Sequence, residues 1–530
     1  MRHLHVLLVC GTFRAQIEVE GPQGMNTKTE ALGTLTAEKL RGISRGIEKE
    51  SLRALPQGTL ALTPHPHALG SALTHPHITT DFSESQVELI TGVHHGVQAC
   101  LDELAQLQHV TAQALGEEML WVSSMPCGLP ADDAIPIGQY GSSNVGRAKS
   151  VYRMGLGHRY GRRMQTISGI HYNWSLPGTD SASYFGLIRN FRRHAFLLLY
   201  LFGASPAVCP TFVAGRKHQL QALSAQTMYL PYATSLRMGR LGYQSDAQAS
   251  LAVSYNDLAG YGASLEDAMT RAYAPYEAIG VRGPDGSYQQ LAATLLQIEN
   301  EFYGTIRPKR SIRPGERPLH AMRERGVEYV EVRLMDLDPF EVQGISAQTM
   351  RFLDVFLLHC LNSPSPQDSP QENAALSRNQ HAVAERGREP GLLLERGEAS
   401  VSLVQWGEEL IEAMKPYAQA LDAAHSGTDY LQAVTAAQQG LQQPDTLPSA
   451  RVLAEITKHH QGSFVSFVRA QSQRMKEAML ATPVDAEHLA RMEHDAVQSW
   501  DAQRRIEAAD TLSFEAYLQD YLSPQRLLPA

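Results

Sequence analysis

Four short segments in the first two thirds of the chain alternate polar and apolar residues with a period of two. They are Gly46–Glu50, Gln86–Leu89, Gly169–Ser175 and Tyr329–Arg333. Successive side chains of a β-strand point to opposite faces, so this spacing predicts strands with one polar and one apolar face. An antiparallel sheet that packs helices on one face and opens the other to a ligand has this pattern. A sheet with a merely solvated outer face has it too.

The predicted polar faces carry acidic residues and a histidine. Glu48 and Glu50 share a face of their strand, and Glu88, His171 and Glu331 lie on the polar faces of the other three. Two carboxylates on one face repel each other unless a cation lies between them. Hard divalent ions take carboxylate oxygens and share the rest of their coordination sphere with water and phosphates. These five residues are therefore candidate metal ligands.

The rest of the chain divides by composition. The Pro- and Ser-rich tract at 363–373 predicts a surface loop, because such polar sequence cannot bury enough apolar surface to fold. Residues 374–530 are rich in Ala, Gln, Glu, Leu and Arg at helical spacing, which predicts a mostly helical C-terminal region packed on the core. We expect residues 1–24 to be a disordered N-terminal extension and residues 25–362 to form the core on which the helical region packs.

Charge and cysteine content narrow the class of partner. The 46 Lys and Arg residues stand against 55 Asp and Glu residues, and this net charge of −9 disfavours nucleic acid and anionic membranes. The five cysteines are too sparse for a disulfide framework or a CxxC metal site. The most apolar internal stretch, Ala195–Phe202, is far shorter than the ~20 residues that span a bilayer. We expect a cytoplasmic protein that acts on small molecules.

A basic segment is the candidate for phosphate binding. Arg307–Arg313 contains four cationic residues in seven positions. Such clusters are often only solvated surface. The chain has no Gly-Lys dipeptide and hence no Walker A loop, and the glycines at 155, 157 and 161 do not match a dinucleotide fingerprint. Any nucleotide is therefore bound by another architecture.

Several ordered segments resemble glutamate–cysteine ligases of the gammaproteobacterial type. They are Arg45–Arg53, Thr79–Phe82, Gly169–Asn173, Ile306–Arg310 and Glu328–Arg333, with further matches at Leu69–His75, Ser124–Cys127, Tyr200–Pro206 and Leu230–Arg237. The matches keep their order from about residue 40 to about residue 360. A resemblance in many ordered motifs is far more specific than a single glycine fingerprint.

The resemblance implies a fold and a reaction. The fold would be α+β and similar to the catalytic domain of glutamine synthetase, with a curved antiparallel sheet forming a funnel and helices on its outer face. The reaction would be the ATP-dependent ligation of the γ-carboxyl group of L-glutamate to the amine of L-cysteine through γ-glutamyl phosphate, the first step of glutathione biosynthesis. The expected partners are glutamate, cysteine and ATP, with Mg²⁺ or alternatively Mn²⁺, and the protein is expected to be a monomer.

The resemblance also implies roles for single residues. Two or three Mg²⁺ ions would be held by Glu48, Glu50, Glu88, His171 and Glu331. Two catalytic residues are implied: Arg333 would stabilise the transferred phosphoryl group or the oxyanion, and Asp81 would orient or deprotonate the amine.

The remaining assignments concern substrate binding. The carboxylate of cysteine would contact Arg237, Tyr243 and Tyr303. The side chain of cysteine would lie in a pocket formed by Phe82, Tyr152, Leu156 and Gln165. The phosphates of ATP would contact Arg307, Lys309 and Arg310.

Other functions remain open at this point. A ligase on the same scaffold could use another amine acceptor, because a fold does not fix its substrate. The acceptor-pocket residues favour cysteine. A noncatalytic binding protein is disfavoured because all five candidate metal ligands are present. The region after residue 373 is too short and too poor in strand signals for the second ATP-binding domain of a fused glutathione synthetase.

Overall fold

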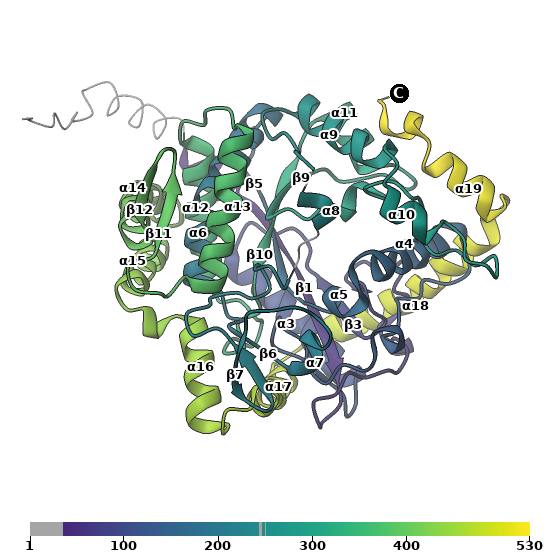
Figure 1. The fold of residues 1–530 in the computed structure, drawn as a ribbon, viewed down its shortest axis with the longest axis horizontal. Helices are drawn as coiled ribbons and strands as arrows, with labels where there is room; N and C mark the ends of the chain where they lie inside the picture. Colours follow the sequence, from purple (N-terminus) through teal and green to yellow (C-terminus); the bar gives the residue numbers. More distant parts are fainter. Residues whose placement is uncertain (1–34, 243–245, 250, 530) are drawn as a thin grey trace, which may run out of the picture.

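The computed structural model describes residues 35–242, 246–249 and 251–529. The expected N-terminal extension at 1–24 and Tyr243 lie outside the described residues. Strands and helices alternate up to about residue 362, and helices dominate after it. The fold is therefore a mixed α and antiparallel β structure (Figure 1).

A seven-stranded sheet forms the centre of the molecule. Its order is β2–β3–β1–β5–β10–β9, with the short β4 paired to the end of β1, and every pairing is antiparallel. The strands are β1 (Ser44–Ala54), β2 (Ile78–Thr80), β3 (Gln86–Ile90), β4 (Met119–Leu120), β5 (Ile170–Ser175), β9 (Ile306–Lys309) and β10 (Tyr329–Met335). The four segments with period-two alternation are β1, β3, β5 and β10, so the strand prediction is confirmed.

Three long helices pack behind the sheet. They are α3 (Val97–Ala114), α6 (Ser181–Phe202) and α12 (Ala347–Asn362). Helix α3 contacts β1 and β3, α6 contacts β9 and β10, and α12 packs on both helices. The apolar stretch at 195–202 is the buried end of α6. This helix begins where the side chain of Asp180 accepts a hydrogen bond from the backbone N–H of Ser183.

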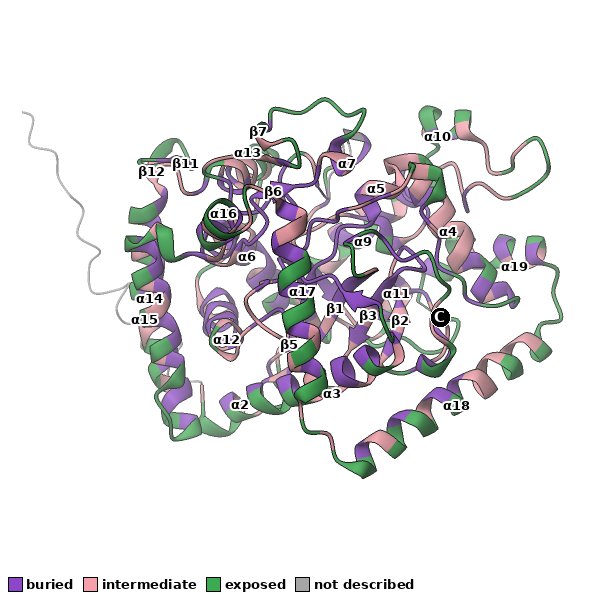
Figure 2. Cartoon of the chain, turned by 90° about the horizontal axis from the view of Figure 1, so that it is seen from below, coloured by how far each residue is buried: buried purple, intermediate pink, exposed green. Residues whose placement is uncertain are grey.

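The C-terminal region forms an outer layer and a long arm of helices. Figure 2 shows that its helices keep buried residues on the side toward the centre and exposed residues outside. The helices are α13 (Pro370–Arg386), α14 (Leu403–His425), α15 (Asp429–Gln442), α16 (Pro448–His459), α17 (Phe464–Ala481), α18 (Ala486–Ala509) and α19 (Phe514–Tyr521). A single hairpin, β11 (Leu393–Arg396) and β12 (Ala399–Ser402), interrupts them in the described residues.

The remaining elements of the described chain include further α-helices and a small sheet. The helices are α2 (Ala37–Arg41), α4 (Asn144–Tyr160), α5 (Arg162–Gln165), α7 (Pro210–Val213), α8 (Asp246–Ala249), α9 (Leu258–Thr270), α10 (Ala274–Ile279) and α11 (Pro318–Arg325). A small sheet contains β6 (Ala207–Val208), β7 (Gln221–Ser224) and β8 (Thr227–Tyr229). Side chains of helix α4 pack against Phe82 beside the sheet.

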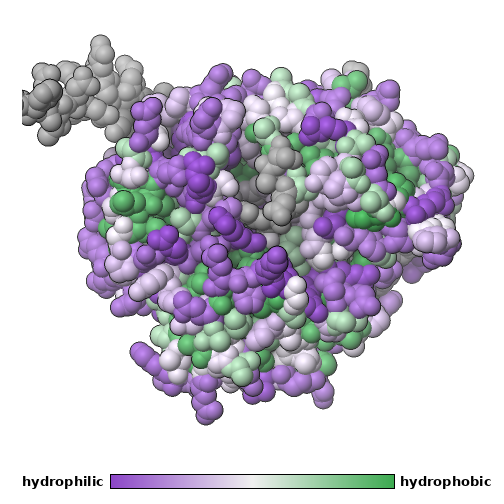
Figure 3. All heavy atoms as spheres, in the orientation of Figure 1, coloured by the Kyte–Doolittle hydropathy of each residue, from purple (hydrophilic) through white to green (hydrophobic). Residues whose placement is uncertain are grey.

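The surface is mostly polar. Exposed large apolar residues such as Leu62, Val93 and Leu393 are far apart in the sequence, and Figure 3 shows apolar residues scattered among charged ones on the face in view. In the described part of the chain, no helix is both long and apolar enough to cross a membrane.

Candidate active site

The sheet register brings the candidate metal ligands onto one face. Glu48 pairs with His171 across β1 and β5, and Glu50 pairs with Glu88 across β1 and β3. Glu331 of β10 pairs with Asn173, two residues beyond His171 on β5. Residues that are directly opposite or two apart on neighbouring strands share a face. Antiparallel pairing therefore gathers residues that are up to 283 positions apart in the sequence.

His171 lies at the centre of this acidic cluster. Its Nδ1 atom is 3.0 Å from Oε2 of Glu48 and 3.8 Å from Oε1 of Glu331. Its Nε2 atom is 3.5 Å from Oε1 of Glu50. The backbone N–H of Gly169 donates to Oε2 of Glu50 at 2.8 Å, which fixes that carboxylate at the start of β5.

Cations border the cluster on the β9 and β10 side. Nζ of Lys309 is 3.1 Å from Oε1 of Glu331, and Nη1 of Arg333 is 3.0 Å from Oε2 of the same carboxylate. Nη1 of Arg307 lies 4.0 Å from Oε2. Arg310 points elsewhere and donates to the carbonyl oxygens of Arg325 and Gly326 at the end of α11. The structure therefore brings Arg307 and Lys309 to the cluster but not Arg310.

The carboxylates differ in electrostatic environment. Burial, with the nearby charge of Asp81, raises the pKa of Glu50 to about 8. The same two causes raise the pKa of Glu88 well above its ordinary value. Burial opposes ionisation of Glu331 as well, but Arg333 and Lys309 hold the pKa of that carboxyl well below its ordinary value. The pKa of Glu48 is lowered despite burial and the charge of Glu331, because His171 hydrogen-bonds to it.

The donor set has the chemistry of a divalent-cation site. Glu48, Glu88 and His171 each offer a ligand atom, and these atoms lie within 4.8 Å of one another. The buried Oδ1 atom of Asn173 accepts no hydrogen bond from the described residues, while its Nδ2 atom donates to Glu48 at 2.9 Å. Clustered carboxylate oxygens with one imidazole suit a hard ion such as Mg²⁺ or Mn²⁺. The residues present therefore fit such an ion.

The candidate acceptor residues gather at the end of the sheet where β5 begins. Phe82 and Leu156 form a small buried cluster against which Tyr152 packs. Nε2 of Gln165 donates to the hydroxyl oxygen of Tyr303 at 2.7 Å. The side chains thus make an apolar surface with a polar edge, a combination that suits a small amphipathic substrate.

Arg237 is held beside these residues. Its side chain is only 2% exposed, its Nη2 atom donates to the carbonyl oxygen of Arg333 at 2.8 Å, and its Nη1 atom lies 3.9 Å from Oδ1 of Asp336. Asp336 in turn accepts hydrogen bonds from the hydroxyl groups of Ser205 at 2.6 Å and Ser235 at 3.0 Å. The guanidinium group is therefore attached to the strand that carries Glu331 and Arg333.

A cavity of about 680 Å³ opens next to Arg237, Tyr303 and Arg333, and its lining extends to Asp368 and Gln380. The Pro-rich tract contributes to its wall. Helix α13 begins at Pro370, so the loop itself spans 363–369.

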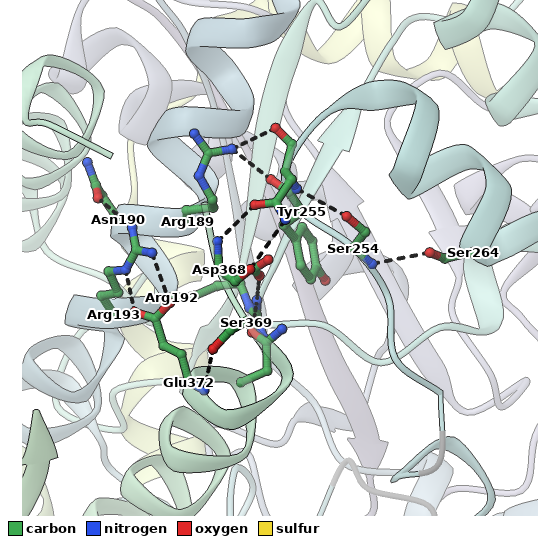
Figure 4. A network of polar contacts seen from close by, with 12 residues as sticks. Arg189, Asn190, Arg192, Arg193, Ser254, Tyr255, Ser264, Asp368, Ser369 and Glu372 are labelled. Carbon is green, nitrogen blue, oxygen red and sulfur yellow. Dashed lines mark hydrogen bonds and ion pairs between the residues drawn. The ribbon is translucent and has the colours of Figure 1, made fainter. Parts of the chain in front are cut away.

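Three arginines of α6 attach this loop to the core (Figure 4). Nη1 of Arg192 is 3.0 Å from Oδ2 of Asp368, and Nη2 of Arg193 donates to the carbonyl oxygen of Pro366 at 2.9 Å. Arg189 donates to side-chain and backbone oxygens of the loop. The predicted surface loop is therefore fixed along the cavity.

The chain is similar to known proteins of one family. The family model for glutamate-cysteine ligase matches residues 31–383, more than half of the chain. The chain belongs to the glutamate–cysteine ligase family. A glutamate–cysteine ligase of Saccharophagus degradans is 47% identical over 505 residues, covering 92% of this chain and 95% of the relative. One of a Janthinobacterium species is 48% identical over 503 residues, covering 91% and 95%.

Solved structures agree with this membership. A glutamate–cysteine ligase from Francisella tularensis in complex with AMP matches with a TM-score of 0.87 and 36% identity, over 91% of this chain and 97% of that one. A bifunctional glutathione synthetase from Pasteurella multocida matches with a TM-score of 0.67 over 90% of this chain and 57% of that one, but at 24% identity this likeness shows the fold alone.

Membership of the glutamate–cysteine ligase family settles the class of reaction. The chain is an ATP-dependent ligase that forms γ-glutamylcysteine from glutamate and cysteine, the first step of glutathione synthesis. The family implies ATP and a divalent metal ion as requirements.

The sequence reasoning did not assign a role to several residues near the site. Gly169 and Asp336 contact candidate residues only in three dimensions, so no local pattern could reveal them. The helical spacing could have identified Lys149 and Arg153 as neighbours of the site. Lys149 lies three residues before Tyr152 on α4, and Arg153 lies three residues before Leu156. Positions separated by three, four and seven residues share a helix face.

Proposed function

We propose that the enzyme transfers the γ-phosphoryl group of ATP to the γ-carboxylate of glutamate and that the amine of cysteine then displaces phosphate from this γ-glutamyl phosphate. The convergence of five metal-ligand candidates with Lys309 and Arg333 on one sheet face supports this proposal most directly. Phosphoryl transfer depends mainly on positioning and on charge stabilisation, and such a face offers both. We also propose that this face is the wall of a funnel similar to that of glutamine synthetase.

Mg²⁺, with Mn²⁺ as an alternative, is the divalent ion that we assign to the acidic cluster. Glu48, Glu50, Glu88, His171 and Glu331 would hold it. When bound, the ions supply positive charge to the ATP phosphates and to the γ-carboxylate.

The cations beside Glu331 bind the phosphate end of the reaction. Lys309 and Arg307 contact the phosphates of ATP, and Arg333 stabilises the transferred phosphoryl group. The position of Arg333 between Glu331 and His171, 3.0 Å and 3.3 Å from their nearest atoms, supports this role. Arg310 contributes no phosphate contact in this proposal, because its side chain turns toward α11.

The acceptor is bound at the other end of the cluster. The guanidinium of Arg237 and the hydroxyl of Tyr303 bind the carboxylate of cysteine, and Tyr243 remains a further candidate. Phe82, Tyr152, Leu156 and Gln165 surround its side chain. Asp81 accepts the proton of the amine, and its influence on the pKa of Glu50 supports a place next to the cluster.

One assay tests this proposal. ADP release is measured with glutamate and Mg²⁺, with cysteine present or replaced by 2-aminobutyrate, alanine or a polyamine. We expect cysteine to be the best acceptor, 2-aminobutyrate to be used because it has a similar shape, and the polyamine to be inactive because it has neither the carboxylate nor the side chain of cysteine. Faster ADP release with the polyamine than with cysteine would show that the site serves another acceptor.

We further propose that the enzyme is a cytoplasmic monomer. The absence of a membrane-spanning helix in the described residues and the scattered apolar surface residues are compatible with this assignment. A stable dimer needs a contiguous interface of roughly 1,200–2,000 Å². Sedimentation at micromolar concentration tests the proposed monomer, and a dimer mass there would contradict it.

A further inference from the structure

Two cations on α4 face the acidic cluster from the side opposite to Lys309 and Arg333. Lys149 and Arg153 lie on the helix face that also carries Tyr152 and Leu156. Nζ of Lys149 lies 5.1 Å from the centroid of the Tyr140 ring, and Cζ of Arg153 lies 4.5 Å from it. Both charges are close enough to Glu88 to interact with it electrostatically. Glu88 belongs to β3, whereas Lys309 belongs to β9 at the far edge of the sheet.

These two cations lack the carboxylate partners that their neighbours have. Arg333, Lys309 and Arg237 each lie within 4.0 Å of a carboxylate oxygen. In the described part of the chain, neither Lys149 nor Arg153 forms an ion pair. Arg153 donates instead to the backbone carbonyl oxygens of Asp81 and Lys149. A half-buried ammonium without a counter-ion favours an anionic ligand.

Besides the γ-carboxylate of glutamate, the substrates of the ligase present three kinds of anionic group. They are the phosphates of ATP, the carboxylate of cysteine and the α-carboxylate of glutamate. The proposed function assigns Lys309 and Arg307 to the first group and Arg237 to the second, and it leaves the third without a cation. The γ-carboxyl group of glutamate must lie at the acidic cluster, so its short aliphatic chain can reach a cation beside Glu88.

We propose that Lys149 and Arg153 bind the α-carboxylate of the glutamate donor. This inference rests on the proposed function. The planar guanidinium of Arg153 can pair with both oxygens of a carboxylate, and Lys149 adds a point charge one helical turn away. One face of α4 then contacts both amino acids. Tyr152 and Leu156 lie next to the acceptor, and Lys149 and Arg153 lie next to the donor.

Lys149→Met is the sharpest variant, because Lys149 donates no side-chain hydrogen bond to the described residues and Met keeps its aliphatic length beside Tyr140. ADP release by the full-length enzyme with Mg²⁺ gives KM for each substrate in turn. We expect the KM for glutamate to rise about tenfold, while those for cysteine and ATP change less than about twofold. Arg153→Lys should also raise the KM for glutamate, since lysine keeps the positive charge but cannot pair with both oxygens of the carboxylate as a guanidinium can.

Arg147→Met is the matched control. Arg147 lies on the same helix, but its Cζ atom lies 4.2 Å from the centroid of the Phe514 ring, away from the cluster. The KM values of Arg147→Met should therefore match those of the wild type. An unchanged KM for glutamate in both test variants overturns the inference. A rise only in the KM for cysteine or only in the KM for ATP overturns it as well, because Lys149 and Arg153 would then bind the acceptor or the nucleotide.

Thermal unfolding covers the case of an inactive variant. With Mg²⁺ and a nonhydrolysable ATP analogue, glutamate should raise the unfolding midpoint of the wild type but not that of Lys149→Met. The analogue alone should still protect both proteins. Protection of the variant by glutamate would contradict the inference. Wild-type enzyme that forms no γ-glutamylcysteine would contradict the proposed function instead, so that reaction is measured first.

Discussion

Replacing Gly169 with alanine should selectively damage the site that we propose for the acceptor. A Cβ atom at position 169 would lie 2.1 Å from Nη2 and 2.6 Å from Cζ of Arg237. The φ angle of Gly169 is not positive, so alanine can adopt the backbone conformation without strain. The clashing atoms are at the end of a long side chain, so the guanidinium of Arg237 must shift while the strand keeps its place.

The expected size of the effect follows from the contacts of Arg237. The shift breaks the 2.8 Å hydrogen bond to the carbonyl oxygen of Arg333 and misaligns the proposed contact with the carboxylate of cysteine. A charge-assisted hydrogen bond contributes about 1.5–3 kcal/mol, so the KM for cysteine should rise about tenfold to a hundredfold. Overpacking should lower the free energy of unfolding by about 1–3 kcal/mol. Glutamate and ATP should be bound nearly as before.

The assay is ADP release at varied cysteine, together with urea unfolding. In an Arg237→Ala background the clashing guanidinium is gone, so adding Gly169→Ala should not raise the KM for cysteine further. Gly96→Ala is the control, because its new Cβ would meet only Ala99 at 3.9 Å. If Gly169→Ala kept a wild-type KM for cysteine, or if its effect added to that of Arg237→Ala, Gly169 would not act through Arg237.

Three further outcomes are expected. Arg237→Ala should raise the KM for cysteine about tenfold to a hundredfold but barely change the KM for cysteamine, which has no carboxylate. A raised KM for glutamate instead would mean that Arg237 binds the donor. Glu331→Gln should fold, as circular dichroism can show, yet lose ligation at limiting Mg²⁺, and near-normal kcat there would contradict its assignment as a ligand. His194→Leu should flatten the pH dependence of unfolding. Burial lowers the pKa of His194 to about 3, so the unfolded wild-type chain binds a proton below about pH 6.5 that the folded chain does not, and stability falls by up to about 1.4 kcal/mol per pH unit toward pH 3. Equal slopes for the two proteins in urea unfolding at pH 4–6 would refute this.

The local pattern predicted which residues share a face but not which strands pair. Alternation placed Glu48 and Glu50 on one face, and this depends only on the geometry of a single strand. The pairing of β1 with both β3 and β5 depends on contacts between distant segments, which one sequence does not reveal. The resemblance provided this information indirectly, through motifs that contribute to the same site.

Charge pairing is the part that the sequence could not predict. Repulsion between Glu48 and Glu50 predicts a cation between them, but the sequence does not reveal that Glu331 is paired with Lys309 and Arg333. Arg310 belongs to the same basic segment as Lys309, yet it turns to the end of α11. Side chains on an edge strand and the loop after it diverge by geometry that composition does not record.

Strand β10 carries or contacts the groups that we propose for phosphoryl binding and for acceptor binding. Its side chains at Glu331 and Arg333 face the acidic cluster, while the carbonyl oxygen of Arg333 receives Arg237. The pairing of β10 with β5 shifts register between Val332 and Met335, and such irregularities re-aim side chains next to active sites. In the proposed mechanism Arg333 binds the phosphoryl group and Arg237 binds the acceptor, and because both are attached to this strand, changes in their separation are limited. A rigid separation of this kind is what attack of an amine on an acyl phosphate requires, since a misplacement of about 1 Å can cost a hundredfold in rate.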